Sequence, residues 1–191
     1  CSEVVVSAPP LIARDLVMPH YAAFARSHRH IRLTLFCDVH FSDLHTGQAD
    51  IALRMARPTA DDLVARRLRD VPYHFYARSD YVARTPRADW GYLTLHLPGV
   101  YGEQIAALLP PERVIFAGND CAVVKTAVMT GAGVGLLPDY LVQPQDGLVR
   151  VTPDAGEIRF SVPLYLVLHE SLRHLPNVRA VADFLVAALK V

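Results

Sequence analysis

The sequence predicts an α/β protein built from two small lobes, and three observations lead to this fold class. Short β-branched runs alternate with helical stretches that carry an apolar stripe. Such an alternation of strand and helix is typical of a parallel sheet covered by helices on both faces. From Val71 onward the pattern starts again with a fresh set of elements. A chain of 191 residues has room for two such lobes.

The charge and hydropathy of the chain exclude several other classes. Nineteen Lys and Arg balance nineteen Asp and Glu, and 52% of the residues are hydrophobic. This composition excludes a disordered chain, and it lacks the basic footprint that strong binding to nucleic acid requires. The longest stretches without a charged residue span only Trp90–Gly102 and Thr126–Pro138. A bilayer span takes about 20 apolar residues, so the sequence predicts no membrane contact.

The first residues and the cysteines indicate whether the chain is part of a longer protein and in which compartment it lies. Cys1 is preceded by neither an initiating Met nor a signal segment, so we expect the chain to be part of a longer protein. Its three cysteines, Cys1, Cys37 and Cys121, form no CxxC pair. An odd number of cysteines without such a pair favours a reducing compartment, and therefore the cytoplasm.

The first lobe is predicted to follow the order strand, helix, strand, helix, strand. Pro9 and Pro10 end the first strand and begin a helix that Pro19 must kink, because proline removes a backbone donor. Ser42 is expected to cap a second helix that starts near Asp43. The other expected segments are the strand Glu3–Ser7, the helix Leu11–Ser27, and the strands Ile31–Phe36 and Ala49–Met55.

The second lobe is predicted from similar patterns. Asn119 is expected to cap a helix with Asp120 in its first turn, and Gly131 is expected to end that helix. Glycine and proline leave Trp90–Pro111 without an assignment, and Leu148–Glu157 is rich in turns. The expected strands are Val71–Ala77, Arg113–Ala117, Val134–Leu137 and Val162–Leu168. The expected helices are Asp80–Arg84 and a closing one striped by Val178, Val181, Ala182, Leu185 and Leu189.

Several strings of the sequence follow the order of a known family. The most specific are "DLHTGQADIALR" at Asp43–Arg54 and "GAGVGLLP" at Gly131–Pro138. Together with "VVVSAPPLIARDLVMPHYAAF" near the start and "PLYLVLHESLRHLPNVRAVADFLVAAL" at the end, they cover nearly the whole chain. In these strings the sequence resembles the effector-binding domain of LysR-type transcriptional regulators.

The resemblance implies a fold like a type 2 periplasmic binding protein, with two Rossmann-like lobes and a central cleft. The implied lobe I comprises residues 1–73 and 170–191, and lobe II comprises residues 74–169. Two crossing strands would join them, near Tyr73–Ala77 and Leu166–Glu170. The resemblance also implies an N-terminal winged helix-turn-helix of about ninety residues, the size of a small domain, which we expect to precede residue 1.

The physics of α/β sheets predicts where a ligand binds. Ligands bind beyond the carboxyl ends of the strands, where helix N-termini offer backbone donors that suit an acid. Ser7 and Asn119 would donate hydrogen bonds, and Arg54 would pair with a carboxylate. Alternatively, Ser7 and Asn119 only cap their own helices and Arg54 only ties down a loop. The candidate effector-binding residues are Ser7, Pro9, Asp38, His40, Arg54, Met55, Tyr76, Tyr101, Asn119, Asp120 and Cys121.

Three short motifs suggest catalysis or metal binding, but their order or spacing does not fit such a site. "TGAGVG" at Thr130–Gly135 follows a helix and precedes a strand, the reverse of the order that a dinucleotide site needs. "HESLRH" at His169–His174 sets its histidines about 140° apart round a helix, so they cannot bind one metal ion from the same face. Asp38 and His40 lack an accompanying nucleophile motif. We expect no catalytic residue, no metal and no cofactor.

The predicted function is that of an effector-sensing domain of a cytoplasmic transcription factor, with a small organic acid as effector. The alternatives are a transporter's solute-binding receptor of the same fold, an enzyme on an α/β scaffold, and a thiol sensor that uses Cys37 and Cys121. The resemblance implies a homodimer or tetramer formed through the lobes. It also implies that DNA is bound only through the N-terminal domain.

Overall fold

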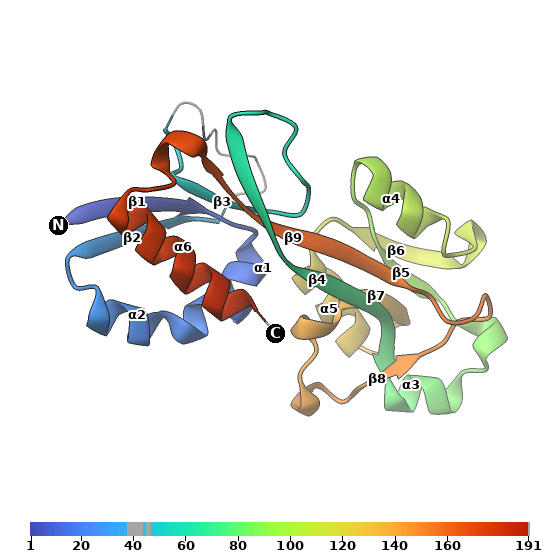
Figure 1. Ribbon diagram of the computed structural model, residues 1–191. Helices are drawn as coiled ribbons and strands as arrows, with labels where there is room; N and C mark the ends of the chain where they lie inside the picture. The colour runs from blue at the N-terminus through green and yellow to red at the C-terminus, as the bar shows by residue number, and fades with distance from the viewer. Residues whose placement is uncertain (38–43, 45–46, 191) are drawn as a thin grey trace. The chain divides into compact units, whose positions relative to one another are not determined.

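The computed structural model describes residues 1–37, 44 and 47–190, and these divide into two compact units (Figure 1). Unit 1 comprises Cys1–Asp70 and Val162–Val191, and unit 2 comprises Val71–Ser161. Two strands contribute residues to both units: β4 spans Leu63–Arg78 and β9 spans Phe160–His169. Within the described residues, no helix has the length and apolar character needed to cross a membrane.

Unit 1 is built on a mixed sheet whose strand order is β2, β1, β3, β9. β1 (Ser2–Ser7) pairs in parallel with β2 (Ile31–Phe36) and with β3 (Ile51–Arg54), as the sequence predicts. β9 pairs antiparallel with β3. The parallel strands end together, so Ser7 and Arg54 lie toward the same edge of the sheet.

The helices of unit 1 bury their apolar stripes against this sheet. The predicted helix Leu11–Ser27 consists of α1 (Pro10–Ile12), a π-helical turn (Ala13–Val17), a 3₁₀ turn (Met18–His20) and α2 (Tyr21–Ser27). Pro19, which cannot donate a backbone hydrogen bond, lies within the 3₁₀ turn that interrupts this helix. After a 3₁₀ turn (Glu170–Leu172), α6 (Pro176–Leu189) contacts β1 and buries Val178, Val181, Leu185 and Leu189.

Unit 2 has the strand order β4, β7, β5, β6, and β8 pairs with β4 on its other side. β5 pairs in parallel with β6 and β7, whereas β4 pairs antiparallel with β7. The strands are β5 (Tyr92–Leu95), β6 (Val114–Gly118), β7 (Val134–Pro138) and β8 (Leu148–Val151). The helices are α3 (Ser79–Arg84), α4 (Gly99–Ala106) and α5 (Cys121–Met129), with 3₁₀ turns at Arg87–Asp89, Pro111–Arg113, Asp139–Leu141 and Pro144–Asp146.

The structure assigns the segments that the sequence leaves open. Trp90–Pro111 contains β5 and α4, and the turn-rich Leu148–Glu157 contains β8. The strand predicted at Val71–Ala77 is the second half of β4, which begins eight residues earlier at Leu63. The predicted cap Ser42 lies outside the described residues. "HESLRH" is the turn between β9 and α6, as predicted.

The glycine-rich run at Gly131–Pro138 allows α5 to pack closely on β7. Gly131 follows the end of α5 at a φ of +79°, a left-handed conformation that favours glycine. Gly135 lies in β7, where an added Cβ would come within 2.4 Å of the Val128 side chain of α5. The run therefore has a packing role, consistent with its predicted place between a helix and a strand.

We predict that Gly135→Ala destabilises the protein by about 1–3 kcal/mol, because the added methyl group overpacks the contact with Val128. Urea unfolding measures the loss. Gly118→Ala is the matched control, since its added methyl group would come no closer than 3.3 Å to the Phe116 ring and 3.7 Å to the Val124 side chain, and we expect it to cost less. Equal stability of wild type and Gly135→Ala would contradict this packing role.

Candidate functional site

Ser7 is a buried hydroxyl at the carboxyl edge of the unit 1 sheet. The parallel register sets it beside Phe36 of β2 and Ala52 of β3. Its residue surface is 6% exposed, and within the part of the chain that the structure describes its hydroxyl makes no hydrogen bond. Ser7 does not cap the following helix, because Pro9 occupies the N-cap position of α1 and no side chain caps that helix. The hydroxyl is therefore available to a ligand.

Arg54 and Met55 lie at the end of β3. The partly buried Arg54 side chain borders a cavity of about 310 Å³, which residues 56–60 and Leu63 complete. Met55 is also partly buried, as is Pro9 after β1. The structure thus places four of the predicted residues, Ser7, Pro9, Arg54 and Met55, at or just beyond the carboxyl ends of neighbouring parallel strands.

Three tyrosines, a phenylalanine and a thiol gather at the start of α5 in unit 2. The Tyr73 ring packs edge to face on Phe160, with the centroids 5.1 Å apart, and Tyr101 packs on the same ring at 6.3 Å. The Tyr73 hydroxyl and the Cys121 thiol share a hydrogen bond. Burial raises the pKa of Tyr73 far above its usual value, and the neighbouring Cys121, Tyr140 and Tyr101 raise it further. We call Tyr73, Tyr101, Cys121, Tyr140 and Phe160 the tyrosine–thiol cluster.

The Cys121 thiol stays protonated at neutral pH. Burial raises its pKa to about 11, and the Asp120 carboxylate contributes to the rise, whereas the hydrogen bond from Tyr73 acts in the opposite direction. A thiol in this state is a weak nucleophile, because the reactive form is the thiolate. The cluster therefore presents neutral groups that combine apolar faces with polar tips.

The sequence predicts two members of this cluster, Tyr101 and Cys121, but misses Tyr73, Tyr140 and Phe160. These three residues come from β4, from the turn after β7 and from β9, so only the tertiary fold brings them together. The sequence gives little indication that they belong to a site. Tyr73, for example, alternates with Phe75 and Ala77 along a buried strand, a pattern that ordinary core residues share.

The N-cap of α5 is Asp120, which corrects the prediction that Asn119 caps this helix. The Asp120 carboxylate accepts hydrogen bonds from the backbone N–H groups of Ala122 (2.8 Å) and Val123 (3.1 Å). A carboxylate suits the positive end of the helix dipole better than a neutral amide, and this favours Asp120 over its neighbour. Asn119 is exposed and is not engaged as a cap. Its amide remains free to act on a ligand.

Tyr76 belongs to a different set of contacts from Tyr73. Its hydroxyl donates to Asp139 Oδ1 at 2.8 Å, and His74 Nδ1 lies 2.7 Å from the same oxygen. Arg150 donates to the other oxygen of Asp139 at 3.1 Å, and its guanidinium lies over the Tyr76 ring. Because side chains alternate along a strand, Tyr73 and Tyr76 face opposite sides of β4. The structure does not bring Tyr76 together with Cys121.

Two predicted residues, Asp38 and His40, lie outside the described residues. Among the residues whose positions are described, no group of three His, Cys, Asp or Glu side chains is arranged to hold a metal ion.

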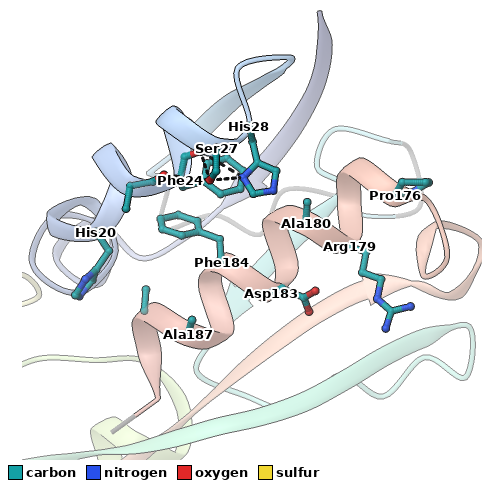
Figure 2. A pocket seen from close by; sticks show the side chains of 12 residues that line it. His20, Phe24, Ser27, His28, Pro176, Arg179, Ala180, Asp183, Phe184 and Ala187 are labelled. Carbon is teal, nitrogen blue, oxygen red and sulfur yellow. Dashed lines mark hydrogen bonds between the residues drawn. The ribbon is translucent and has the colours of Figure 1, made fainter.

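Two grooves flank helix α6 in unit 1. The first, of about 750 Å³, lies between α6 and α2, and Figure 2 shows the rings of Phe24 and Phe184 inside it. These rings are 4.7 Å apart, and His28 stacks on Phe24 at 4.5 Å. The second groove, of about 450 Å³, lies between α6 and the strands β4 and β9. Neither contains a residue that the sequence predicts as a ligand contact.

Comparison with known proteins identifies the family. The model of the LysR substrate-binding domain matches residues 1–190. The chain belongs to this LysR family. A related sequence is the HTH-type transcriptional regulator PtxR of Pseudomonas aeruginosa, 28% identical over 94% of this LysR domain and 62% of the relative. A second relative is an HTH-type transcriptional regulator of Xanthomonas campestris, also 28% identical, over 91% of the chain and 55% of the relative.

Solved structures confirm the predicted fold class. The LysR domain is similar to the regulatory domain of CrgA from Neisseria meningitidis, with a TM-score of 0.80, 23% identity and 98% coverage of each chain. The full-length AphB of Vibrio cholerae matches with a TM-score of 0.78 and 20% identity, over 99% of this chain and 69% of that one. The family is one of transcriptional regulators and not of enzymes. The chain spans less than two thirds of the length of the two regulators named above.

We predict that the stabilities of Asp120→Ala and Asn119→Ala identify which of the two residues caps α5. Asp120→Ala should cost about 1 kcal/mol of stability, because two backbone donors of α5 lose their acceptor. Asn119→Ala should leave the stability within about 0.5 kcal/mol of wild type, as for an exposed side chain that is not a cap. Thermal and urea unfolding of both variants provide the comparison. A larger loss in Asn119→Ala than in Asp120→Ala would contradict this assignment of the cap.

Proposed function

We propose that this LysR domain senses a small organic acid and that binding regulates transcription by the whole protein. The match of the family model to residues 1–190 carries the proposal. The two sets of residues described above support it, because each combines apolar surface with a few polar groups, as small-molecule sites do. Within unit 1 we propose Ser7, Pro9, Arg54 and Met55 as ligand contacts. Within unit 2, as a separate set, we propose Tyr73, Tyr101, Asn119, Cys121 and Tyr140.

The carboxylate of the effector is assigned to the unit 1 residues. Arg54 supplies a positive charge there and Ser7 a buried hydroxyl. In unit 2, the Asp120 carboxylate already uses the first free N–H groups of α5, so a second carboxylate at that point would be repelled. Taken by itself, the neutral tyrosine–thiol cluster of unit 2 is suited to an apolar or hydroxylated ligand group.

The alternatives receive less support. A thiol sensor would need a reactive thiolate, and burial raises the pKa of Cys121 to about 11. A transporter receptor shares the fold, but the related sequences carry the names of transcriptional regulators. For the whole protein we propose DNA binding through a separate N-terminal domain, self-association of the regulatory domains, and a place in the cytoplasm.

We predict that Arg54→Gln weakens effector binding by about 10- to 100-fold, the loss of one charge-assisted hydrogen bond. A panel of mono- and dicarboxylic acids of two to eight carbon atoms is first screened for a rise in Tm, which reports binding to the folded state. Calorimetric titration of the acid found then compares wild type, Arg54→Gln and Arg54→Lys, and the last should retain part of the affinity.

Arg26→Gln is the matched control, because Arg26 is an exposed cation on α2. We expect it to bind the acid as wild type does. Equal binding by Arg54→Gln would remove Arg54 from the site, and a panel in which neutral analogues stabilise the domain as well as the acids would overturn the assignment of an acidic effector.

A further inference from the structure

The groove between α6, β4 and β9 has an apolar floor and a cationic rim. Its floor is formed by Val64 of β4, Leu166 and Leu168 of β9, and Val178, Ala182 and Val186 of α6. Leu166, Leu168 and Val178 are buried, and the others are partly buried. All of these residues belong to unit 1, so the groove is formed within one compact unit. Its volume of about 450 Å³ falls in the range of small-molecule sites.

Four cationic or imidazole side chains stand at the edge of this floor. Arg66 projects from β4, Arg173 and His174 precede α6, and Arg179 lies in its first half. Asp183 is the one carboxylate among the residues that border the groove. Among the residues that the structure describes, none forms a hydrogen bond or ion pair with the side chain of Arg66, Arg173, His174 or Arg179. Figure 2 shows that the Arg179 side chain points away from Phe24, and Arg179 also borders the groove beside α2.

This concentration of charge is local, because the chain as a whole has a formal net charge of zero. Three guanidinium groups around a concave apolar floor create a positive potential that attracts anions. A guanidinium also binds a carboxylate through two parallel hydrogen bonds, which fixes the orientation of the bound group. A ligand with a carboxylate head and an apolar body would satisfy both parts of the groove.

We propose that this groove is a second ligand site, which takes a small monocarboxylate with an apolar body, such as a medium-chain or aromatic acid. Arg66 and Arg173 bind the carboxylate, and the aliphatic floor receives the apolar part. None of the bordering residues belongs to the proposed effector site, so the two sites are separate in their residues. The small floor enclosed by a polar rim suits a small molecule, and this decides against a protein segment as its occupant.

The test uses octanoate as the probe and the isotope-labelled domain in solution. NMR titration should show saturable shifts of the backbone amides of Arg173, Arg179 and Ala182. The double variant Arg66→Gln/Arg173→Gln should weaken octanoate binding at least tenfold. The control double variant Arg26→Gln/Arg29→Gln, which removes two exposed charges beyond the groove, should bind as wild type does. Loss of octanoate binding in both double variants would show that binding depends only on the net charge of the domain, and it would overturn the proposal.

Three further measurements make the outcome specific. Octanol should bind at least tenfold more weakly than octanoate, and equal binding would refute the role of the cations. Inorganic phosphate should not displace octanoate at equal concentration. Displacement would show that the groove binds any anion and that its apolar floor plays no part, which would refute the proposal. Arg54→Gln should leave octanoate binding at the groove intact. If octanoate instead binds only through Arg54, the second site is excluded while the proposed effector site stands.

A last experiment tests whether the groove is instead a contact between two copies of the chain. Sedimentation of wild type and of Arg66→Gln/Arg173→Gln should give the same oligomeric state. If the variant changes the oligomeric state and leaves octanoate binding unchanged, the groove is a contact between copies of the chain and the small-molecule assignment is wrong.

Discussion

The alternation of side chains along β4 is the constraint on which the arrangement of unit 2 depends. Tyr73 and Phe75 point to one face of the strand, where Tyr73 meets Cys121 and Phe160 and Phe75 meets Tyr92. His74 and Tyr76 point to the other face and converge on Asp139. A slip of one residue would exchange the two faces and place an imidazole where a phenol now bonds a thiol. The antiparallel pairing with β7 and β8 fixes this register.

The position of the tyrosine–thiol cluster along the chain suggests how a ligand acts. Tyr73 comes three residues after the point where β4 passes from unit 1 to unit 2, and Phe160 comes just before β9 passes back. A ligand that contacts these residues therefore contacts the strands that connect the units. Binding can regulate through a difference in affinity between two conformations, where about 1.4 kcal/mol shifts the equilibrium tenfold. A protonated thiol and neutral phenols suit such recognition better than chemistry on the ligand.

The sequence predicts the regular elements well wherever a local pattern determines them. The β-branched runs of β1 and β7 and the apolar stripe of α6 depend on burial along one element. The first half of β4 is missed because its charged residues, such as Arg66 and Asp70, hide the strand pattern. The cap of α5 is misplaced by one residue because Asn119 and Asp120 are both good capping residues, and only the backbone geometry distinguishes them.

The candidate sites are harder to predict than the fold because they assemble residues from distant segments. Tyr140 and Phe160 meet Tyr73 through tertiary packing, and the rim of the second groove joins Arg66 to Arg173 across about one hundred residues of chain. Ser7 differs in that its position at the end of a parallel strand follows from topology alone, while its role in binding stays a prediction.

The most direct test of the account is to incubate the domain with the acid that stabilises it, recover the ligand for chemical analysis, and follow Tyr73 and Tyr101 by NMR. The account predicts unchanged ligand, one molecule bound per chain, and saturable shifts of both tyrosine rings. Chemically altered ligand in catalytic excess over protein, or saturation without any change at Tyr73 and Tyr101, would contradict it.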